Sequence, residues 1–286
     1  MSEAQASESA GEYFTRFTKR NIVLVVVLFL SNIVTAASTF ITAGLAIHRK
    51  TSDWRPAEYR RVQDLRAGQT YERFKRRLGG PVYRPKGIPF SPNAPGYQRV
   101  LFHPRSEYWV EAITGPGGVV AVYTVTSCDK DFNPRFYVRK ERGTGSAVRL
   151  NKTAMSDVVR LDDPGVKVRT AITQTGTVHT MSAFQQVRKY AGDRFRDFAW
   201  GVNSSCTMHS RPSGRNLEAG WGQWQRRQSS APPPWFFPIV EGGSVDKQGR
   251  DMLSMTVVNT FTETDLNQDL SSHYPALGGI DKYVIL

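Results

Sequence analysis

Residues 107–127 read EYWVEAIT-GPGG-VVAVYTVTS. Both arms of this stretch are rich in β-branched and aromatic residues, which favour strands, and the glycine-proline loop between them is typical of a hairpin. Residues 97–102 predict a third strand. A loop this short joins strands only in the antiparallel sense, so the stretch predicts an antiparallel sheet with the hairpin 108–127 at its centre.

Two short helices are predicted on the N-terminal side of the hairpin. The first begins near Pro56, and the second runs from an N-cap at Thr70 to a stop at Gly79. The second helix has an apolar face, which we expect to pack on one face of the sheet. The side chains expected to be buried there and in the hairpin are Tyr71, Phe74, Leu78, Val110, Ala121 and Tyr123.

The C-terminal half carries weaker signals. Ser182-x-x-Gln185 resembles a capping box and predicts a helix over 183–191. Residues 195–202 and 252–262 predict strands. Helices that segregate from an antiparallel sheet define the α+β class, so the expected fold is α+β: a single N-terminal transmembrane helix, the two-helix unit, and the sheet.

The membrane segment is predicted from an uncharged run at residues 22–47, IVLVVVLFLSNIVTAASTFITAGLAI. As a helix it would reach roughly 39 Å, whereas the hydrocarbon core is about 30 Å thick. We therefore expect residues 21–48 to form an uncleaved transmembrane helix. A cleaved signal peptide is the alternative, with Lys19 and Arg20 as its basic region and a small-residue site at 34–36.

Hydroxyl residues recur on one side of this expected helix. Their spacings of four, three and four place Ser31, Thr35, Ser38 and Thr42 on one face. Small and hydroxyl residues let helices approach closely in lipid, so this face predicts helix association, including a homodimer. The alternative is that the hydroxyls bond to their own backbone carbonyls.

The charged residues are distributed unevenly over the rest of the chain. Residues 1–20 are polar and are expected to be a disordered tail, and residues 49–286 are expected to be one soluble domain. The formal charge is +13. Residues 48–86 hold twelve Lys and Arg against four Asp and Glu, a net of +8, which leaves a near-neutral body. This basic collar, over 49–86, predicts contact with anionic lipid headgroups rather than nucleic acid. The expected lipid-binding side chains are Arg49, Lys50, Arg73, Lys75, Arg76 and Arg77.

The side of the membrane is predicted from the same charges. Three Lys and Arg precede the run within about 20 residues and six follow it, so the positive-inside rule predicts a cytoplasmic body. Lys19 and Arg20 oppose translocation of the tail and weigh against that orientation. The two cysteines, Cys128 and Cys206, permit a disulfide without implying one, and a disulfide would place the body outside.

Few residues suggest a catalytic, metal-binding or ligand-binding site. Cys206 and His209, with His179 nearby, have metal-like spacing at one end but lack a second ligand pair, and Cys206 with a histidine is also a candidate nucleophile and base. Residues 221–227, WGQWQRR, fit stacking on bases or sugars, or aromatic packing with a basic rim. No motif predicts a catalytic residue, cofactor or metal site.

Two sets of motifs carry resemblances. Residues 64–81, with Gly68-x-Thr70 and Leu78-Gly79-x-Pro81, resemble the opening of small bacterial lipoproteins of outer-membrane assembly. Lys130-Asp-Phe-Asn-Pro134, then Leu150-Asn-Lys-Thr153 and Val258-Asn-Thr-Phe261, resemble an uncharacterised bacterial family with an N-terminal transmembrane helix, over roughly 52–286. Gly278-Gly279 departs from the Phe-Gly expected there. The resemblance implies a bacterial inner-membrane setting and an α+β fold, and it carries no catalytic residue.

These observations predict a single-pass, membrane-anchored interaction or scaffold module. Its collar would bind anionic lipid and its body a protein partner of unknown identity, without cofactor or catalysis. The alternative is a membrane-tethered hydrolase or transferase that uses Cys206 or a histidine. A nucleic-acid binder is the weakest hypothesis, because the bilayer already accounts for the excess of positive charge.

Overall fold

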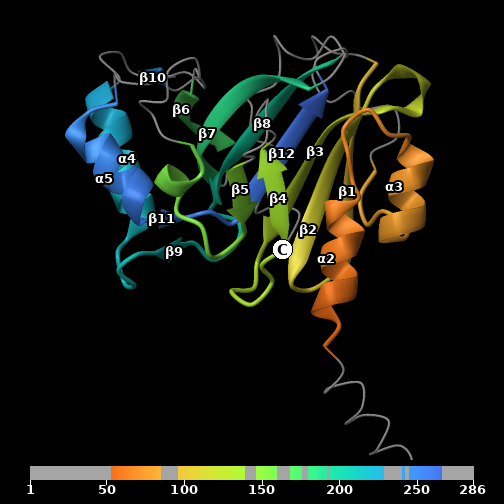
Figure 1. Ribbon diagram of the computed structural model, residues 1–286, viewed down its shortest axis with the longest axis horizontal. Coiled ribbons are helices and arrows are strands. Elements are labelled where there is room, and N and C mark those ends of the chain that lie inside the picture. Colours follow the sequence, from red (N-terminus) through yellow and green to blue (C-terminus); the bar gives the residue numbers. More distant parts are fainter. Residues whose placement is uncertain are drawn as a thin grey trace, which may run out of the picture. The chain divides into compact units, whose positions relative to one another are not determined.

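The computed structural model describes residues 53–84, 96–138, 146–159, 168–175, 180–191, 194–228, 240–241 and 245–265. The chain divides into two compact units, Met1–Trp54 and Arg55–Leu286. All the labelled helices and strands of Figure 1 belong to the second unit.

The dominant element is one antiparallel sheet of eight strands, in the order β1-β2-β3-β12-β8-β7-β6-β10. Two three-stranded meanders, β1-β2-β3 and β6-β7-β8, are joined side by side because β12 inserts between β3 and β8. The bounds of its strands are β1 Gln98–Arg105, β2 Tyr108–Thr114, β3 Val120–Ser127, β6 Val168–Thr175, β7 Thr180–Ala191, β8 Arg194–Asn203, β10 Val240–Glu241 and β12 Thr260–Asp265.

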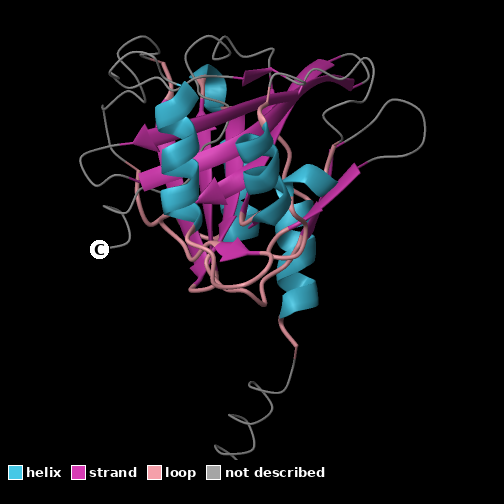
Figure 2. Ribbon diagram, turned by 90° about the vertical axis from the view of Figure 1, so that its left-hand side faces the viewer, coloured by secondary structure: helices cyan, strands magenta, loops and turns pink. Residues whose placement is uncertain are grey.

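Two small two-stranded sheets accompany the large one, β4 with β5 and β9 with β11. Four α-helices and two short 3₁₀ helices complete the described part of the chain. These elements are α2 Arg55–Gln63, α3 Tyr71–Leu78, η1 Pro116–Gly118, β4 Arg135–Val138, β5 Ser146–Arg149, η2 Met155–Asp157, β9 His209–Ser210, α4 Leu217–Gln228, α5 Lys247–Met255 and β11 Thr256–Val257. Figure 2 shows the sheet from the end where α4 and α5 lie.

The predicted α+β class is wrong, because the described body is built mainly of β-strands with only short helices around them. The main error is the helix predicted over 183–191, which is the long strand β7. Side chains on both faces of this strand are buried, including Ala183, Phe184 and Val187. A strand buried on both faces loses its polar alternation, and its apolar residues then match a helical spacing by chance.

Two further features of the fold differ from the sequence prediction. Residues 247–255 form α5 rather than the start of a strand, because the Asp246 carboxylate caps the helix by accepting the Gly249 N–H at 2.7 Å. The hairpin 108–127 pairs as predicted, residue by residue from Tyr108 opposite Ser127, but it lies toward one side of the sheet. The centre is occupied by β12 and β8, and no local sequence pattern predicts that these two strands pair.

The two-helix unit is present where it was predicted. The Thr70 hydroxyl accepts the Arg73 N–H, and Gly79, at a φ of 90°, ends α3 by donating its N–H to the Lys75 carbonyl at 2.9 Å. The six side chains expected in the core are all buried. The Phe74 ring lies edge-on to the Tyr123 ring at 5.7 Å, so α3 packs on the sheet as expected.

One face of the sheet carries the main aromatic core. Tyr108 stacks on Phe132 at 4.3 Å, and Phe136 of β4 stacks on Phe261 of β12 at 4.5 Å. On the same face, the Trp200 indole N–H lies 3.2 Å from the Met155 carbonyl of η2. The helices α2 and α3, the β4–β5 hairpin and η2 therefore cover this face, and the hairpin is held between α2 and the middle of the sheet.

Candidate functional site

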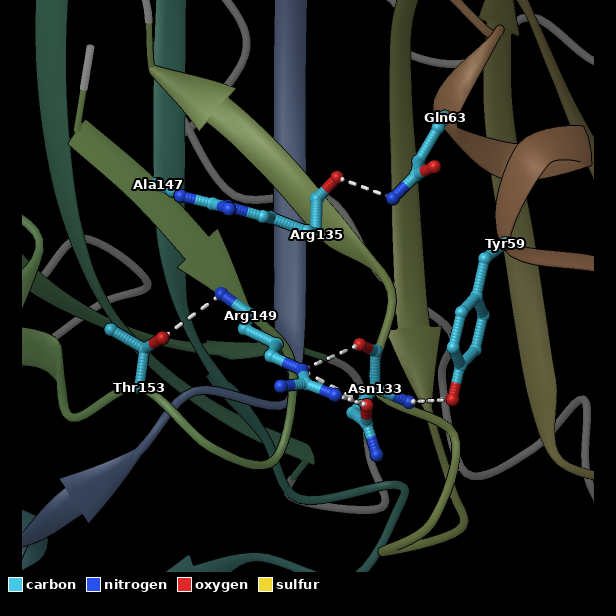
Figure 3. A pocket seen from close by; sticks show the side chains of 7 residues that line it. All are labelled: Tyr59, Gln63, Asn133, Arg135, Ala147, Arg149 and Thr153. Carbon is cyan, nitrogen blue, oxygen red and sulfur yellow. Dashed lines mark hydrogen bonds between the residues drawn. The ribbon is translucent and has the colours of Figure 1, made fainter. Parts of the chain in front are cut away.

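A pocket of about 390 Å³ lies between α2 and the β4–β5 hairpin. It is lined by Tyr59, Gln63, Asn133, Arg135, Ala147, Arg149 and Thr153. Figure 3 shows Tyr59 and Gln63 reaching from α2 toward the hairpin and the loop before it.

The α2 side of the pocket is fixed by hydrogen bonds to residues about 70 positions later in the chain. The Tyr59 hydroxyl donates to the Asp131 carbonyl at 3.0 Å and accepts the Asn133 N–H at 3.1 Å. The Gln63 side-chain amide donates to the Arg135 carbonyl at 2.9 Å. These bonds attach α2 to both the loop and β4.

The hairpin side of the pocket presents two arginines. Arg135 and Arg149 are direct partners in the β4–β5 register and are both exposed. The Arg149 guanidinium donates from Nε and Nη2 to the Asn133 side-chain oxygen, at 3.0 and 2.8 Å. The guanidinium carbon of Arg135 lies 5.0 Å from the centre of the Tyr137 ring, a cation–π distance.

Beneath the pocket the three short motifs of the sequence analysis meet. Asn151, held at a φ of 56°, donates from its side-chain amide to the Ser127 hydroxyl at 2.7 Å and to the Phe132 carbonyl at 3.1 Å. Its backbone N–H donates to the Val258 carbonyl at 2.6 Å, and the Val258 N–H donates to the Thr153 carbonyl at 2.9 Å. Residues from 130–134, 150–153 and 258–261 therefore form one hydrogen-bonded cluster that supports the pocket.

The residues that line the pocket limit the chemistry it can offer. None of the seven lining residues is acidic, and none is a histidine, cysteine or lysine. The lining offers guanidinium, hydroxyl and amide groups, which can hydrogen-bond to an anion. Across the described residues, no group of three or more potential ligand side chains is placed to hold a metal ion.

The predicted lipid-binding residues of α3 lie together on its exposed side. Arg73, Lys75, Arg76 and Arg77 are exposed, opposite the buried face of the helix. Arg77 pairs with Asp64 at 2.9 Å, whereas the other three make no ion pair within the described part of the chain.

Two apolar side chains are exposed beside this basic face. Val82 and Tyr83 follow α3 along the outer edge of β1, where the Val82 N–H donates to the Leu101 carbonyl at 2.9 Å, and they are 57% and 43% exposed. The Arg84 guanidinium carbon lies 4.5 Å from the centre of the Tyr71 ring. None of these three residues was predicted from the sequence, although an apolar pair next to a basic helix is visible there.

Cys206 is bonded to Cys128 in a disulfide, so its sulfur is not a free thiol. The bond lies beside Leu101 and Trp109. Of the histidines, His103 stacks on Trp109 with ring centres 3.8 Å apart, and its pKa is lowered mainly by burial. His209 is half-buried on β9, and the structure does not bring it together with a second metal-ligand pair in the described residues.

The tryptophans of residues 221–227 are in the core. Trp221 and Trp224 lie on α4, are fully buried, and donate their indole N–H groups to Thr256 and Asp246 at 3.0 and 2.9 Å. They are therefore not available for stacking on a base or a sugar, and the packing interpretation is confirmed. Arg226 and Arg227 form the basic rim on the exposed side.

Several predicted features lie outside the described residues. They are the tail at 1–20, the membrane segment at 21–48 with Ser31, Thr35, Ser38 and Thr42, the collar residues Arg49 and Lys50, and His48, His179 and His273. Within the described residues, none of the helices combines the length and apolar character needed to cross a bilayer.

The lining residues of the pocket were not predicted as a group. Asn133 and Asn151 belong to the motifs recognised in the sequence, whereas Tyr59, Arg135 and Arg149 were not singled out there. Comparison with known proteins adds no assignment: no family model matches the chain, and neither does any curated protein or solved structure.

Proposed function

We propose that the protein is a membrane-anchored binding module, which rests the basic face of α3 on an anionic lipid surface and presents its β-body to a protein partner. The observation that carries this proposal is the arrangement on α3. Its apolar side is buried on the sheet, and its other side exposes Arg73, Lys75 and Arg76 with no ion pair in the described residues.

The magnitude of the attraction can be worked out from these charges. A Lys or Arg near an anionic bilayer contributes about 1 kcal/mol at low salt. The three unpaired cations together then contribute about 3 kcal/mol, which is roughly a hundredfold in the membrane partition coefficient. Arg77 adds less, because Asp64 already neutralises part of its charge.

Val82 and Tyr83 support the same surface. Apolar and aromatic side chains next to a basic patch enter the region between headgroups and acyl chains, where an aromatic ring with a polar end is favoured. Both residues lie on the outer edge of β1, where their side chains are exposed. We therefore include Val82, Tyr83 and Arg84 in the lipid-facing surface.

The side of the membrane is a separate part of the proposal. The Cys128–Cys206 disulfide favours an oxidising compartment, because cytosolic proteins rarely keep structural disulfides. The count of Lys and Arg favours the cytoplasm. We give the disulfide more weight, since Lys19 and Arg20 dilute the charge asymmetry, and we propose that the body lies outside the cytoplasm.

A vesicle-binding experiment tests the lipid contact. The fragment 49–286 is expected to sediment with anionic vesicles, to ignore neutral ones, and to bind less as salt rises. Reversal of Arg73, Lys75, Arg76 and Arg77 to Glu is expected to abolish this binding. The control reverses four exposed cations on or just before α4 and α5, namely Arg215, Arg226, Arg227 and Lys247. These helices lie at the end of the sheet away from α3 (Figure 1), and the control changes the net charge equally but should cost far less binding. Equal losses in the two variants would refute a specific surface on α3.

A further inference from the structure

We propose that the pocket between α2 and the β4–β5 hairpin binds a carboxylate carried by an extended peptide of a partner protein, with Arg135 and Arg149 as its ligands. This goes beyond the lipid contact, and the two proposals are tested by separate measurements.

The positive charge of the pocket is the first reason to expect an anionic ligand. Arg135 and Arg149 lie directly opposite each other across the two strands, and both side chains are on the exposed face, since their neighbours Phe136 and Val148 are buried. Like charges in direct cross-strand register destabilise a hairpin. No acidic residue lines the pocket to relieve this repulsion. An anion bound in the pocket would offset this repulsion.

The Arg149 guanidinium is already positioned by hydrogen bonds, which is the second reason to expect an anion here. Two of its N–H groups are held by the Asn133 side-chain oxygen, and the Asn133 backbone is held in turn by the Tyr59 hydroxyl. Its Nη1 has no partner in the described residues and remains for a ligand. A planar guanidinium held in this way binds a carboxylate with little loss of side-chain entropy.

The surface beside the pocket indicates what kind of molecule carries the carboxylate. The exposed face of the hairpin continues past the pocket to Tyr137, which is 54% exposed and lies against Arg135. Tyrosine and arginine are the residues that dominate binding at protein interfaces. A pocket of about 390 Å³ that opens onto such a face fits a carboxylate followed by further peptide residues.

Three fluorescent hexapeptides test the proposal on the full chain, purified in a neutral detergent. The first has a free C-terminal carboxylate and no acidic side chain, the second is amidated with one central Glu, and the third replaces that Glu with Gln. We expect the first or the second to bind at least tenfold more tightly than the third, and the stronger one identifies the source of the carboxylate. Equal binding of all three peptides would overturn the proposal.

Point variants locate the binding. Arg149→Gln and Arg135→Gln are each expected to weaken peptide binding at least tenfold, whereas Arg226→Gln on α4 leaves it unchanged. Arg135→Gln should not lower the melting temperature of the free protein, because it removes the cross-strand repulsion, and this variant keeps the test decisive if Arg149→Gln misfolds. Unchanged peptide affinity in Arg135→Gln contradicts the proposal. Vesicle binding should be unaffected in each variant, which separates this site from α3.

Discussion

Removal of the Cys128–Cys206 disulfide should destabilise the body strongly. The two cysteines are 78 residues apart in the sequence. For a closed loop of that length the chain-entropy model gives about 4.5 kcal/mol at 25 °C. A domain of this size is stable by roughly 5–15 kcal/mol, so the loss would remove a large part of the total.

Urea unfolding measures this effect. We substitute Cys206 by Ala, because its side chain is buried among Leu101 and Trp109, and Cys128 by Ser. Each single variant should lower the urea midpoint by roughly 2 M, taking about 2–3 kcal/mol per M as the slope. The double variant should be no less stable than either single one, since the first substitution already breaks the bond.

Reduction of the parent protein provides the control. A reductant should lower the parent midpoint to that of the variants and leave the variants unchanged. If the parent ignores the reductant and the variants unfold at the parent midpoint, the cysteines are not bonded in solution. A body outside the cytoplasm would then have no support from the cysteines.

Three further predictions concern the fold. Gly201→Ala should destabilise the protein by about 1–3 kcal/mol in urea unfolding, because the new Cβ would clash with the Ala183 carbonyl oxygen and the Phe184 backbone. Gly222→Ala on α4 meets no atom closer than 3.7 Å and should be neutral or stabilising. Equal effects would refute the close approach of β7 to β8 at Gly201. Burial raises the pKa of Tyr123 to about 12, so the native state keeps a proton that the unfolded chain loses above about pH 10, and stability should fall by about 1.4 kcal/mol per pH unit between those values. Tyr123→Phe should remove that part of the decline, and an unchanged pH profile would contradict it. Asp246→Ala should cost about 1–3 kcal/mol, because its carboxylate caps α5 and accepts the Trp224 indole N–H, and a loss below about 0.5 kcal/mol in urea unfolding would show that the cap is weak.

The sequence predicted those parts of the fold that local interactions determine. The hairpin 108–127 and the helix after Thr70 each have their strand or helix signal, their turn and their stop within about 20 residues. The strand β7 was misread because both its faces are buried, which leaves no polar alternation to separate a strand from a helix. The position of β12 between β3 and β8 depends on pairings about 60 and 140 residues apart, which no local pattern encodes.

The candidate pocket also depends on long-range contacts that local sequence patterns do not encode. Its walls come from α2 and from residues about 70 positions later, and Tyr59 contributes to the pocket through hydrogen bonds of its hydroxyl. The motifs at 130–134, 150–153 and 258–261 were recognised in the sequence only by their order. Their convergence on Asn151 became visible once the fold placed them together.

Contact between α3 and an anionic bilayer is the central claim of this account, and a site-specific probe measures it directly. Glu72 and Glu218 are both exposed acidic residues in the first turn of a helix, on α3 and α4 respectively. An environment-sensitive fluorophore attached to Glu72→Cys in the fragment 49–286 should shift its emission to the blue when anionic vesicles are added. It should also be quenched by lipids labelled near the headgroups, whereas the same fluorophore on Glu218→Cys should show neither change. A larger shift at Glu218→Cys, or no shift at Glu72→Cys on vesicles that bind the protein, would contradict the account.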